Sequence, residues 1–374
     1  MKILFNNIGK STNYLKNIEL LYSNYTNFRK KHFSNLCLEH LQKMYPASKL
    51  LLTHSATGGL EIIAELLHIQ KGDEVIMPSF TFVSTANAFV SKGATPVFVD
   101  IDKNTLNIDI QQIEEHISHK TKAIVAMHYG GHPCDLKQLR ALCDKHHLFL
   151  IEDAAMGFGN HYNNQPLGSI GDFGVISFDI TKQISAVQGG LLLINNADYV
   201  KRAGHIYHIG TNREDFMDGN VPYYEWVDVG SKYQLNELNA AVLLDQLERY
   251  PEIIAHRNIV SKLYHYYLKP LELQGKFRLM SDTHLENNCH EYYLILNDQF
   301  ERDNLSKYLY NYGIETMFHY IPLHNSTKGR SFGHRELPNT IEISESLLRL
   351  PMHTELGETH IQYIVNKIKS YWEE

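Results

Sequence analysis

The sequence predicts an α/β protein in which helices cover both faces of a mainly parallel sheet. From about residue 51, short β-rich runs alternate with helical stretches, and most of the runs are continuously apolar. Strands that are buried on both faces have this composition. Alternating strands and helices also indicate α/β layering with right-handed crossovers. The runs are residues 74–77, 96–100, 123–127, 148–151, 175–178 and 191–194.

The segments between these runs have the periodicity of helices. Leu60, Ile63, Ala64 and Leu67 form one apolar stripe at the spacing of a helix face. Residues 136–146 form a second helical segment, directly before the fourth apolar run.

The pattern changes near Leu235. From there to Leu268 the sequence predicts long helix, with a break near Pro251. A smaller α+β unit follows, and the absence of a low-complexity linker favours tight packing of the two parts. The expected domains are residues 1–250 and 251–374, with a strand at 292–296 and helices at 305–312 and 361–372 in the smaller one.

Composition excludes several classes of protein. The 374 residues include 35 Lys and Arg against 42 Asp and Glu, a net charge of −7. This balance argues against general binding of nucleic acid, which needs a basic face, but allows one local cationic site. The hydrophobic content of 43% and charged content of 21% exclude a disordered, collagenous or coiled-coil chain. The apolar start is too short for a signal peptide and no long apolar run suggests a membrane span, so we expect a cytoplasmic protein.

The cysteines and histidines do not predict a metal or redox site. Cys37, Cys134, Cys143 and Cys289 lie far apart without a CxxC pair, which favours reduced and mostly buried thiols. The 22 histidines include no HExxH motif. We therefore expect no metal ion.

Two charged residues follow apolar strands. Asp153 comes at the end of the run 148–151, and ligands of parallel sheets bind beyond the carboxyl ends of the strands. Lys182 lies just past the run 175–178, where burial would lower the pKa of its amine, as a Schiff-base lysine requires. Taken singly, Asp153 could be only a helix N-cap and Lys182 only a solvated charge.

Two further segments suit a phosphorylated aromatic ligand. Residues 54–60 open the first amphipathic helix. The backbone amides at this helix start, together with the small residues and the Thr57 hydroxyl, could bind a phosphate. An ordinary helix N-cap would explain the same residues. The Walker loop GxxxxGK[ST] is absent. Phe82, just past the run 74–77, could stack on a planar ring, although core packing is the ordinary role of Phe.

Together these features predict a site for pyridoxal phosphate (PLP). This cofactor needs a lysine for its aldehyde, an acid for its pyridine nitrogen, a phosphate cradle and a stacking face. The order of these elements, with Lys182 placed 182 − 153 = 29 residues after Asp153, is the order expected in aspartate-aminotransferase-like folds.

The sequence resembles the nucleotide-sugar aminotransferases of the DegT/DnrJ/StrS type, which are fold type I PLP enzymes. The resemblance runs from about residue 51 to the C-terminus. Its most specific segments are residues 72–89, 166–172 and 318–324, with further similarity at 210–213 and 226–231.

The resemblance implies a role for each matching residue. Lys182 would hold the cofactor aldehyde and shuttle the proton, and Asp153 would keep the pyridine nitrogen protonated. Lys232 would reach the phosphate of the neighbouring subunit's cofactor, which implies a homodimer with shared active sites. Phe82 would stack on the ring, Thr57, Gly58 and Ser177 would hold the phosphate, Met156 would lie beside the ring, and Arg213, His319 and Tyr320 would contact the substrate.

Several positions depart from the family pattern. Met156 replaces a Gln near the 3-oxygen of PLP, which removes a hydrogen bond of roughly 1 kcal/mol net. Lys232 stands where an Asn is frequent and could offer the phosphate a cation. The other departures are Asp179 for His, Gln183 for Asn and Gln188 for Glu.

The implied reaction transfers the amino group of L-glutamate to a dTDP-linked keto-6-deoxyhexose. dTDP-4-keto-6-deoxyglucose is the preferred acceptor, giving a 4-amino-4,6-dideoxy sugar for surface polysaccharide such as O-antigen. Amination at C-3, a UDP-linked substrate and a non-catalytic sensor that binds PLP or a nucleotide sugar stay open. A PLP-dependent sugar dehydratase is disfavoured, because such enzymes carry His where this chain has Lys182.

Overall fold

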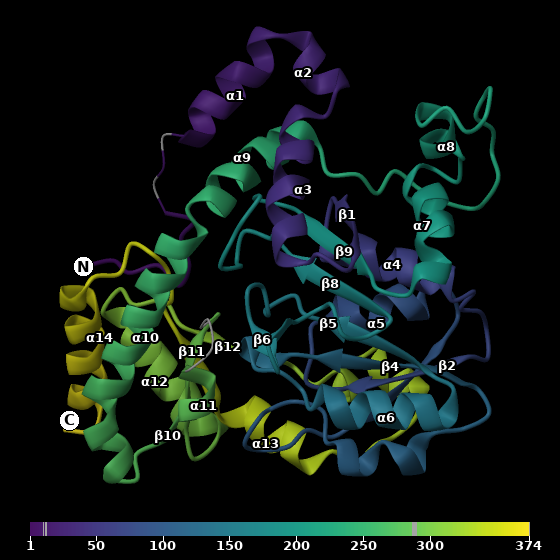
Figure 1. Ribbon diagram of the computed structural model, residues 1–374. Helices are drawn as coiled ribbons and strands as arrows, with labels where there is room; N and C mark the ends of the chain where they lie inside the picture. The colour runs from purple at the N-terminus through teal and green to yellow at the C-terminus, as the bar shows by residue number, and fades with distance from the viewer. Residues whose placement is uncertain (10, 12, 286–289, 374) are drawn as a thin grey trace.

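The computed structural model describes residues 1–9, 11, 13–285 and 290–373 and contains two main sheets (Figure 1). The larger has seven strands in the order β1-β9-β8-β5-β4-β2-β3. All six predicted runs are strands of this sheet, and β1 is an additional edge strand. The strands are β1 Lys49–Thr53, β2 Glu74–Pro78, β3 Thr95–Val99, β4 Thr121–Met127, β5 Phe149–Asp153, β8 Phe173–Ser177 and β9 Gly190–Ile194.

The mainly parallel sheet is confirmed, with one strand reversed. β9 pairs antiparallel with both β1 and β8, whereas the other neighbouring strands pair in parallel. The short segment between β8 and β9 makes this reversal possible, because a parallel pair needs a crossover of a dozen or more residues that usually contains a helix. That short segment carries Lys182.

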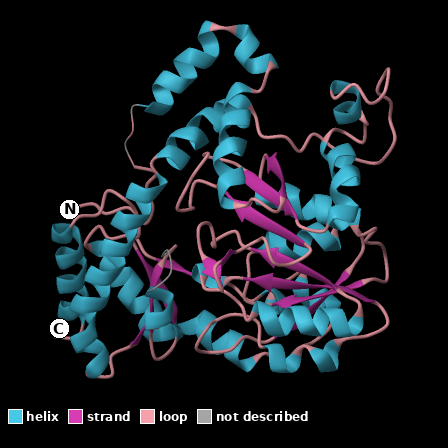
Figure 2. Cartoon of the chain, in the orientation of Figure 1, coloured by secondary structure: helices cyan, strands magenta, loops and turns pink. Residues whose placement is uncertain are grey.

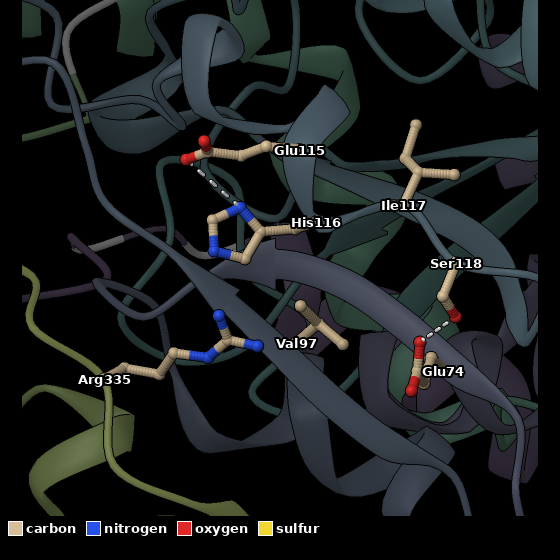
Figure 3. A pocket seen from close by; sticks show the side chains of 7 residues that line it. All are labelled: Glu74, Val97, Glu115, His116, Ile117, Ser118 and Arg335. Carbon is tan, nitrogen blue, oxygen red and sulfur yellow. Dashed lines mark hydrogen bonds and ion pairs between the residues drawn. The ribbon is translucent and has the colours of Figure 1, made fainter.

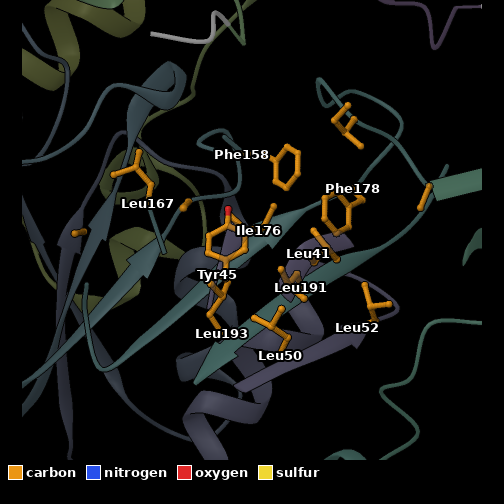
Figure 4. Packing of buried hydrophobic residues seen from close by; sticks show 14 of the residues in the cluster. Leu41, Tyr45, Leu50, Leu52, Phe158, Leu167, Ile176, Phe178, Leu191 and Leu193 are labelled. Carbon is orange, nitrogen blue, oxygen red and sulfur yellow. The ribbon is translucent and has the colours of Figure 1, made fainter. Parts of the chain in front are cut away.

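Helices cover both faces of the large sheet (Figure 2), which explains why its strands are apolar throughout. Side chains of one strand alternate between two cores, so that Leu50 and Leu52 face one core and Leu51 the other. Figure 4 shows the first core, where Leu41 and Tyr45 lie over the sheet. The covering helices are α3 His32–Met44, α6 Leu136–His146 and α9 Glu237–Glu248 on this side, and α4 Ala56–Leu66, α5 Val83–Val90 and α7 Val200–Tyr207 on the other.

The C-terminal part is built on a four-stranded antiparallel sheet, as the predicted α+β unit requires. The predicted helix break falls at Arg249, between α9 and α10, and Pro251 lies in the first turn of α10, where its missing N–H is not needed. The domain boundary near residue 250 stays a prediction. The elements are β10 Arg278–Leu279, β11 Tyr292–Ile295, β12 Met317–Phe318, β13 Leu347–Leu350, α10 Tyr250–Leu273, α12 Gln299–Asn311, α13 Pro338–Ser346 and α14 Glu358–Tyr371.

The first residues of the chain return to the C-terminal sheet, so that both ends of the chain lie beside it (Figure 1). The Met352 N–H donates to the Phe5 carbonyl at 3.2 Å, and Ile3 forms a bridge with Ile314. The remaining elements are α1 Asn13–Ser23, α2 Tyr25–Arg29, α8 Arg213–Met217, α11 Asp282–Leu285, β6 His161–Tyr162, β7 Gln165–Pro166, and the 3-10 turns Ile110–Gln112, Glu114–His116, Tyr129–Gly131, Ala197–Tyr199, Leu323–Asn325 and Gly329–Phe332.

Cys37, Cys134 and Cys143 are buried free thiols, while Cys289 lies outside the described residues. Among the described residues, no group of three or more His, Cys, Asp or Glu side chains could hold a metal ion. No helix in the described ranges is long and apolar enough to cross a membrane.

Candidate active site

A cavity of about 400 Å³ lies at the carboxyl ends of β5 and β8, between the large sheet and the C-terminal sheet. Ligands of parallel α/β sheets bind at this edge. Most of the predicted site residues line it, although they come from segments far apart in the sequence. These are Thr57, Phe82, Asp153, Met156, Ser177, Lys182, His319 and Tyr320.

Asp153 is the last residue of β5 and is held rigidly at the cavity wall. It is 6% exposed, and one carboxylate oxygen accepts a hydrogen bond of 2.6 Å from the Thr85 hydroxyl. The other oxygen accepts from the Ala155 N–H at 3.2 Å. Thr81 in turn lies 2.8 Å from the Thr85 hydroxyl. These contacts fix the direction in which the carboxylate points.

Lys182 lies in the loop that joins β8 to β9. Its N–H donates to the Asp179 carbonyl at 3.0 Å, which closes a tight turn and sets the start of the side chain. Burial lowers the pKa of the amine, while the Asp153 carboxylate opposes that shift and the Arg349 guanidinium adds to it. The net lowering makes the amine a better nucleophile than an exposed lysine.

The N-terminus of α4, the predicted phosphate cradle, lies at the cavity, although Gly58 is placed differently from the prediction. Ser55 is the N-cap and accepts the Gly58 N–H at 3.1 Å, so that this amide is already engaged. Gly58 is not among the residues that line the cavity, whereas Ser55, Ala56 and Thr57 are. Ser177 lines the cavity too, and its hydroxyl accepts the Asp179 N–H at 3.3 Å.

Gly190 allows the cradle to sit against the sheet. A Cβ on this residue would lie 2.4 Å from the Ala56 nitrogen and 2.4 Å from the Ser55 carbonyl carbon, which no side chain could tolerate. The Gly189-Gly190 pair after Lys182 is therefore the sequence signal of this close approach.

Phe82 and Met156 differ in exposure. Phe82, the residue before α5, is 59% exposed. This exposure leaves its ring accessible to a planar ligand. Met156 is 4% exposed, and the Gln183 side chain donates to its carbonyl at 3.2 Å. Gln183, a departure from the family pattern, therefore fixes the backbone beside the cavity.

The C-terminal sheet supplies a charged wall that the sequence analysis missed in part. The rings of His319 and Tyr320 stack with their centroids 3.8 Å apart. Arg349 and His290, which the sequence did not predict as site residues, line the same cavity. Burial and the nearby cations Arg349 and Lys182 lower the pKa values of His290 and His319 well below the usual range, so that both rings are neutral. Arg349 could have been predicted as a site residue, because it is a single charge inside the apolar run Leu347–Leu350.

Phe5 lines the cavity as well, with its ring 4.9 Å from the Arg349 guanidinium carbon. No pattern in the first residues predicted this. The link depends on long-range pairing of the N-terminal segment with residues beyond 310.

Besides Gly58, two predicted residues do not line this cavity. Lys232 is exposed and forms a β-bridge with His208, and Arg213 begins α8 with its guanidinium 5.8 Å from the centroid of the Tyr224 ring. Their roles stay predictions. For Lys232 the prediction concerns a neighbouring subunit.

A second hollow, of about 420 Å³, lies beside the first residue of β2, and Figure 3 shows the side chains that line it. Glu74, at its wall, is the first residue of β2, so the hollow opens at the amino ends of parallel strands. Ligands of such sheets bind at the carboxyl ends instead. Arg335 is the cation at its wall.

Comparison with known proteins identifies relatives over nearly the full chain. The profile of the DegT/DnrJ/EryC1/StrS aminotransferase family matches residues 37–369. The uncharacterized protein MJ1066 of Methanocaldococcus jannaschii is 31% identical over 344 residues, 89% of each chain. The structure of DesI in the presence of its TDP-sugar product is 27% identical, with a TM-score of 0.85 over 99% of this chain and 92% of that one. The PLP form of Spr1654 from Streptococcus pneumoniae shares the fold at 24% identity, with a TM-score of 0.87 over 100% and 99% of the chains.

The chemistry of the cavity fits PLP. Lys182 offers an amine at the cavity wall for an aldehyde, and Asp153 offers a fixed carboxylate for a ring nitrogen. The N-terminus of α4 suits an anionic phosphate, because its free amides point outward and the helix dipole is positive there. The hydroxyls of Ser55, Thr57 and Ser177 line the same cavity.

Proposed function

Because the chain belongs to the DegT/DnrJ/EryC1/StrS family of PLP-dependent sugar aminotransferases, we propose that it moves an amino group from L-glutamate to a dTDP-linked keto-6-deoxyhexose. PLP is its cofactor. The observation that carries the proposal is that Asp153, at the end of β5, and Lys182, in the loop after the neighbouring strand β8, line one cavity.

Each residue near the cofactor then has a distinct task. PLP, when bound, supplies an aldehyde that accepts amino groups and a ring that withdraws electrons. Lys182 would hold that aldehyde and, once released, carry the proton to and from the substrate carbon. Asp153 would keep the ring nitrogen protonated, with Thr85 fixing its carboxylate. Phe82 would stack on the ring, and the α4 N-terminus with Ser177 would bind the phosphate.

The overall exchange balances without another reactant. Glutamate gives up its amino group and one hydrogen and becomes 2-oxoglutarate, whose new oxygen comes from water. The ketone gains the amino group and one hydrogen and becomes an amine, and its oxygen leaves as water, so that the water consumed and the water released cancel. Because glutamate and the sugar would react in turn at the same cavity, the kinetics should be ping-pong.

We propose dTDP-4-keto-6-deoxyglucose as the acceptor. The TDP-sugar product in the DesI structure supports a dTDP-linked substrate. Residues 210–213 and 226–231 resemble the transaminase that makes dTDP-4-amino-4,6-dideoxygalactose for enterobacterial common antigen, which favours C-4 amination and a role in surface polysaccharide.

A homodimer with shared sites is part of this proposal. Tyr223, Trp226 and Val229 are 67%, 79% and 60% exposed, in the same segment that ends at Lys232. Large apolar side chains gathered on one exposed segment are typical of a contact surface. In a dimer this segment could carry Lys232 to the phosphate of the neighbouring site.

Incubation with L-glutamate and dTDP-4-keto-6-deoxyglucose, beside its 3-keto isomer, tests the proposal. NMR of the product should show an amine at C-4 and release of 2-oxoglutarate. Amination of the 3-keto isomer alone would move the reaction to C-3. If no 2-oxoglutarate forms with either sugar, the protein is not a glutamate-dependent sugar aminotransferase.

A further inference from the structure

The turn that carries Lys182 makes few hydrogen bonds to the rest of the protein. It spans residues 179–182, just after β8, and Ile180 within it is 47% exposed. Its own hydrogen bonds are local. The Lys182 N–H donates to the Asp179 carbonyl at 3.0 Å, and the Thr181 N–H donates to the Asp179 carboxylate at 3.0 Å. A turn bonded mainly to itself can keep its shape and still move as a unit.

One hydrogen bond joins this turn to a distant segment of the chain. The Asn6 side-chain amide donates to the Ile180 carbonyl at 2.7 Å, at the short end of the range for such bonds. Among the hydrogen bonds and ion pairs between described residues, it is the only one that links residues 179–182 to a part of the chain distant in sequence. The position of the turn therefore depends on how firmly Asn6 is held.

The segment before Asn6 is held firmly by the C-terminal part of the chain. The Ile3 carbonyl accepts the Glu315 N–H at 3.0 Å. The Phe5 N–H donates to the Glu315 carboxylate at 3.1 Å, and the Phe5 carbonyl accepts the Met352 N–H at 3.2 Å. Because both backbone groups of Phe5 are bonded, the chain has a fixed course into the next residue, which is Asn6.

These first residues connect the two walls of the active-site cavity. The Phe5 ring lines the cavity and lies 4.9 Å from the guanidinium carbon of Arg349, on the wall formed by the C-terminal sheet. Arg349 is itself fixed there, with its Nε atom 2.6 Å from the Glu291 Oε2 atom. The next residue, Asn6, holds the turn that ends in Lys182, on the wall formed by the large sheet. Groups that react at one cavity need such a link, since a misplacement of about 1 Å can cost roughly 100-fold in rate.

We infer that Asn6 is a positioning residue for Lys182: by holding the Ile180 carbonyl, it keeps the lysine directed into the cavity and aligned with the wall formed by the C-terminal sheet. Asn6 precedes residue 37, where the match to the family begins, so this device belongs to the N-terminal segment of this chain. The inference depends on PLP binding by Lys182 and not on which donor or sugar reacts.

Asn6→Asp tests the inference with little change of shape. A carboxylate has no N–H to donate, so the bond to the Ile180 carbonyl is lost. Asn7→Asp is the matched control, because it makes the same change of charge one residue later. The Asn7 side chain accepts the Gly9 N–H at 3.1 Å, and a carboxylate can accept it equally well.

Two measurements on the apoprotein follow the turn and the lysine separately. Hydrogen exchange with mass spectrometry follows the peptide that contains residues 179–182, and stopped-flow absorbance follows the uptake of PLP. In Asn6→Asp this peptide should exchange faster, because the turn opens more often. PLP uptake should slow roughly fivefold, the equivalent of one hydrogen bond, because the lysine is in position for a smaller fraction of the time. The peptide around Asp153 should not change, and Asn7→Asp should match the unmodified protein in both measurements.

The inference requires both changes in Asn6→Asp. Unchanged exchange, faster exchange with normal PLP uptake, or an equal effect of Asn7→Asp would overturn it. Asn6→Ala removes the amide without adding a charge and should repeat both changes. If it does not, the slow uptake in Asn6→Asp comes from the added charge, and the inference is wrong. If the unmodified protein takes up PLP but does not react with glutamate, the proposed function fails while these two measurements still decide the role of Asn6.

Discussion

The two walls of the active-site cavity are built in different ways. One wall is made by strand ends of the mainly parallel sheet, where Asp153 is the last residue of β5 and Lys182 lies in the loop after β8. The other is made by the antiparallel sheet, where Arg349 lies inside a strand and Glu291 just before one. On the first wall the fixed charge is held by neutral donors, and on the second by an opposite charge. The first wall suits a cofactor that stays bound, and the second wall suits a ligand that binds and dissociates in each reaction cycle.

The largest effect should come from Lys182→Ala. This variant should lose the visible absorbance of lysine-bound PLP and all measurable turnover, because no other described amine lines the cavity. Absorbance spectroscopy and 2-oxoglutarate release measure the two losses. Lys201→Ala, which changes an exposed lysine, should behave like the unmodified enzyme. Retained glutamate-dependent amination in Lys182→Ala would break the assignment of the first wall.

Asp153→Asn should have the second-largest effect. This substitution removes the charge of the side chain and keeps its shape. Without the carboxylate the pyridine nitrogen loses its protonating partner, and kcat should fall roughly 100-fold or more. Thr85→Val removes only the hydrogen bond to that carboxylate and should cost about tenfold. Steady-state kinetics measures both, with the exposed Asp198→Asn as the control. If Asp153→Asn were no worse than Thr85→Val, the charge at Asp153 would have no catalytic role.

Gly190→Ala tests how closely the first wall is packed. The added methyl group must push the start of α4 away from β9, which should destabilise the protein by about 2 kcal/mol and weaken PLP binding. Urea unfolding and PLP titration measure these changes. Gly357→Ala is the matched change, since its nearest new neighbour is 3.8 Å away, and it should cost less than about 1 kcal/mol. Equal effects of the two substitutions would contradict the close packing of the start of α4 on β9.

The smallest effect concerns pH. The rate at which apoprotein takes up PLP depends on the neutral form of Lys182, so the rate should rise with pH and level off above the pKa of that amine. Because burial lowers this pKa, the plateau should begin below the ordinary lysine value of 10.5. Stopped-flow absorbance follows the uptake. If the uptake rate keeps rising up to the ordinary lysine pKa, the pKa of Lys182 is not lowered.

The sequence predicted the first wall better than the second for a physical reason. Asp153 and Lys182 directly follow apolar runs, and strand ends in a parallel sheet meet at one edge, so local pattern is enough to bring them together. Arg349 is brought to the cavity by antiparallel pairing of β13, and Phe5 by contacts across more than 300 residues. Such contacts leave no local periodicity. Gly58 shows that a motif does not predict the hydrogen bonds of single residues. Its segment lies at the start of α4, as predicted, but the Gly58 N–H donates to the Ser55 hydroxyl.

The most direct test of the account is to locate the lysine that carries PLP. Borohydride reduction fixes the cofactor to its lysine, and mass spectrometry of the digested protein then identifies the modified peptide. The account predicts one modified residue, Lys182, and no modification when excess glutamate is added before reduction. Modification of a different lysine, or a label on Lys182 that glutamate does not remove, would contradict it.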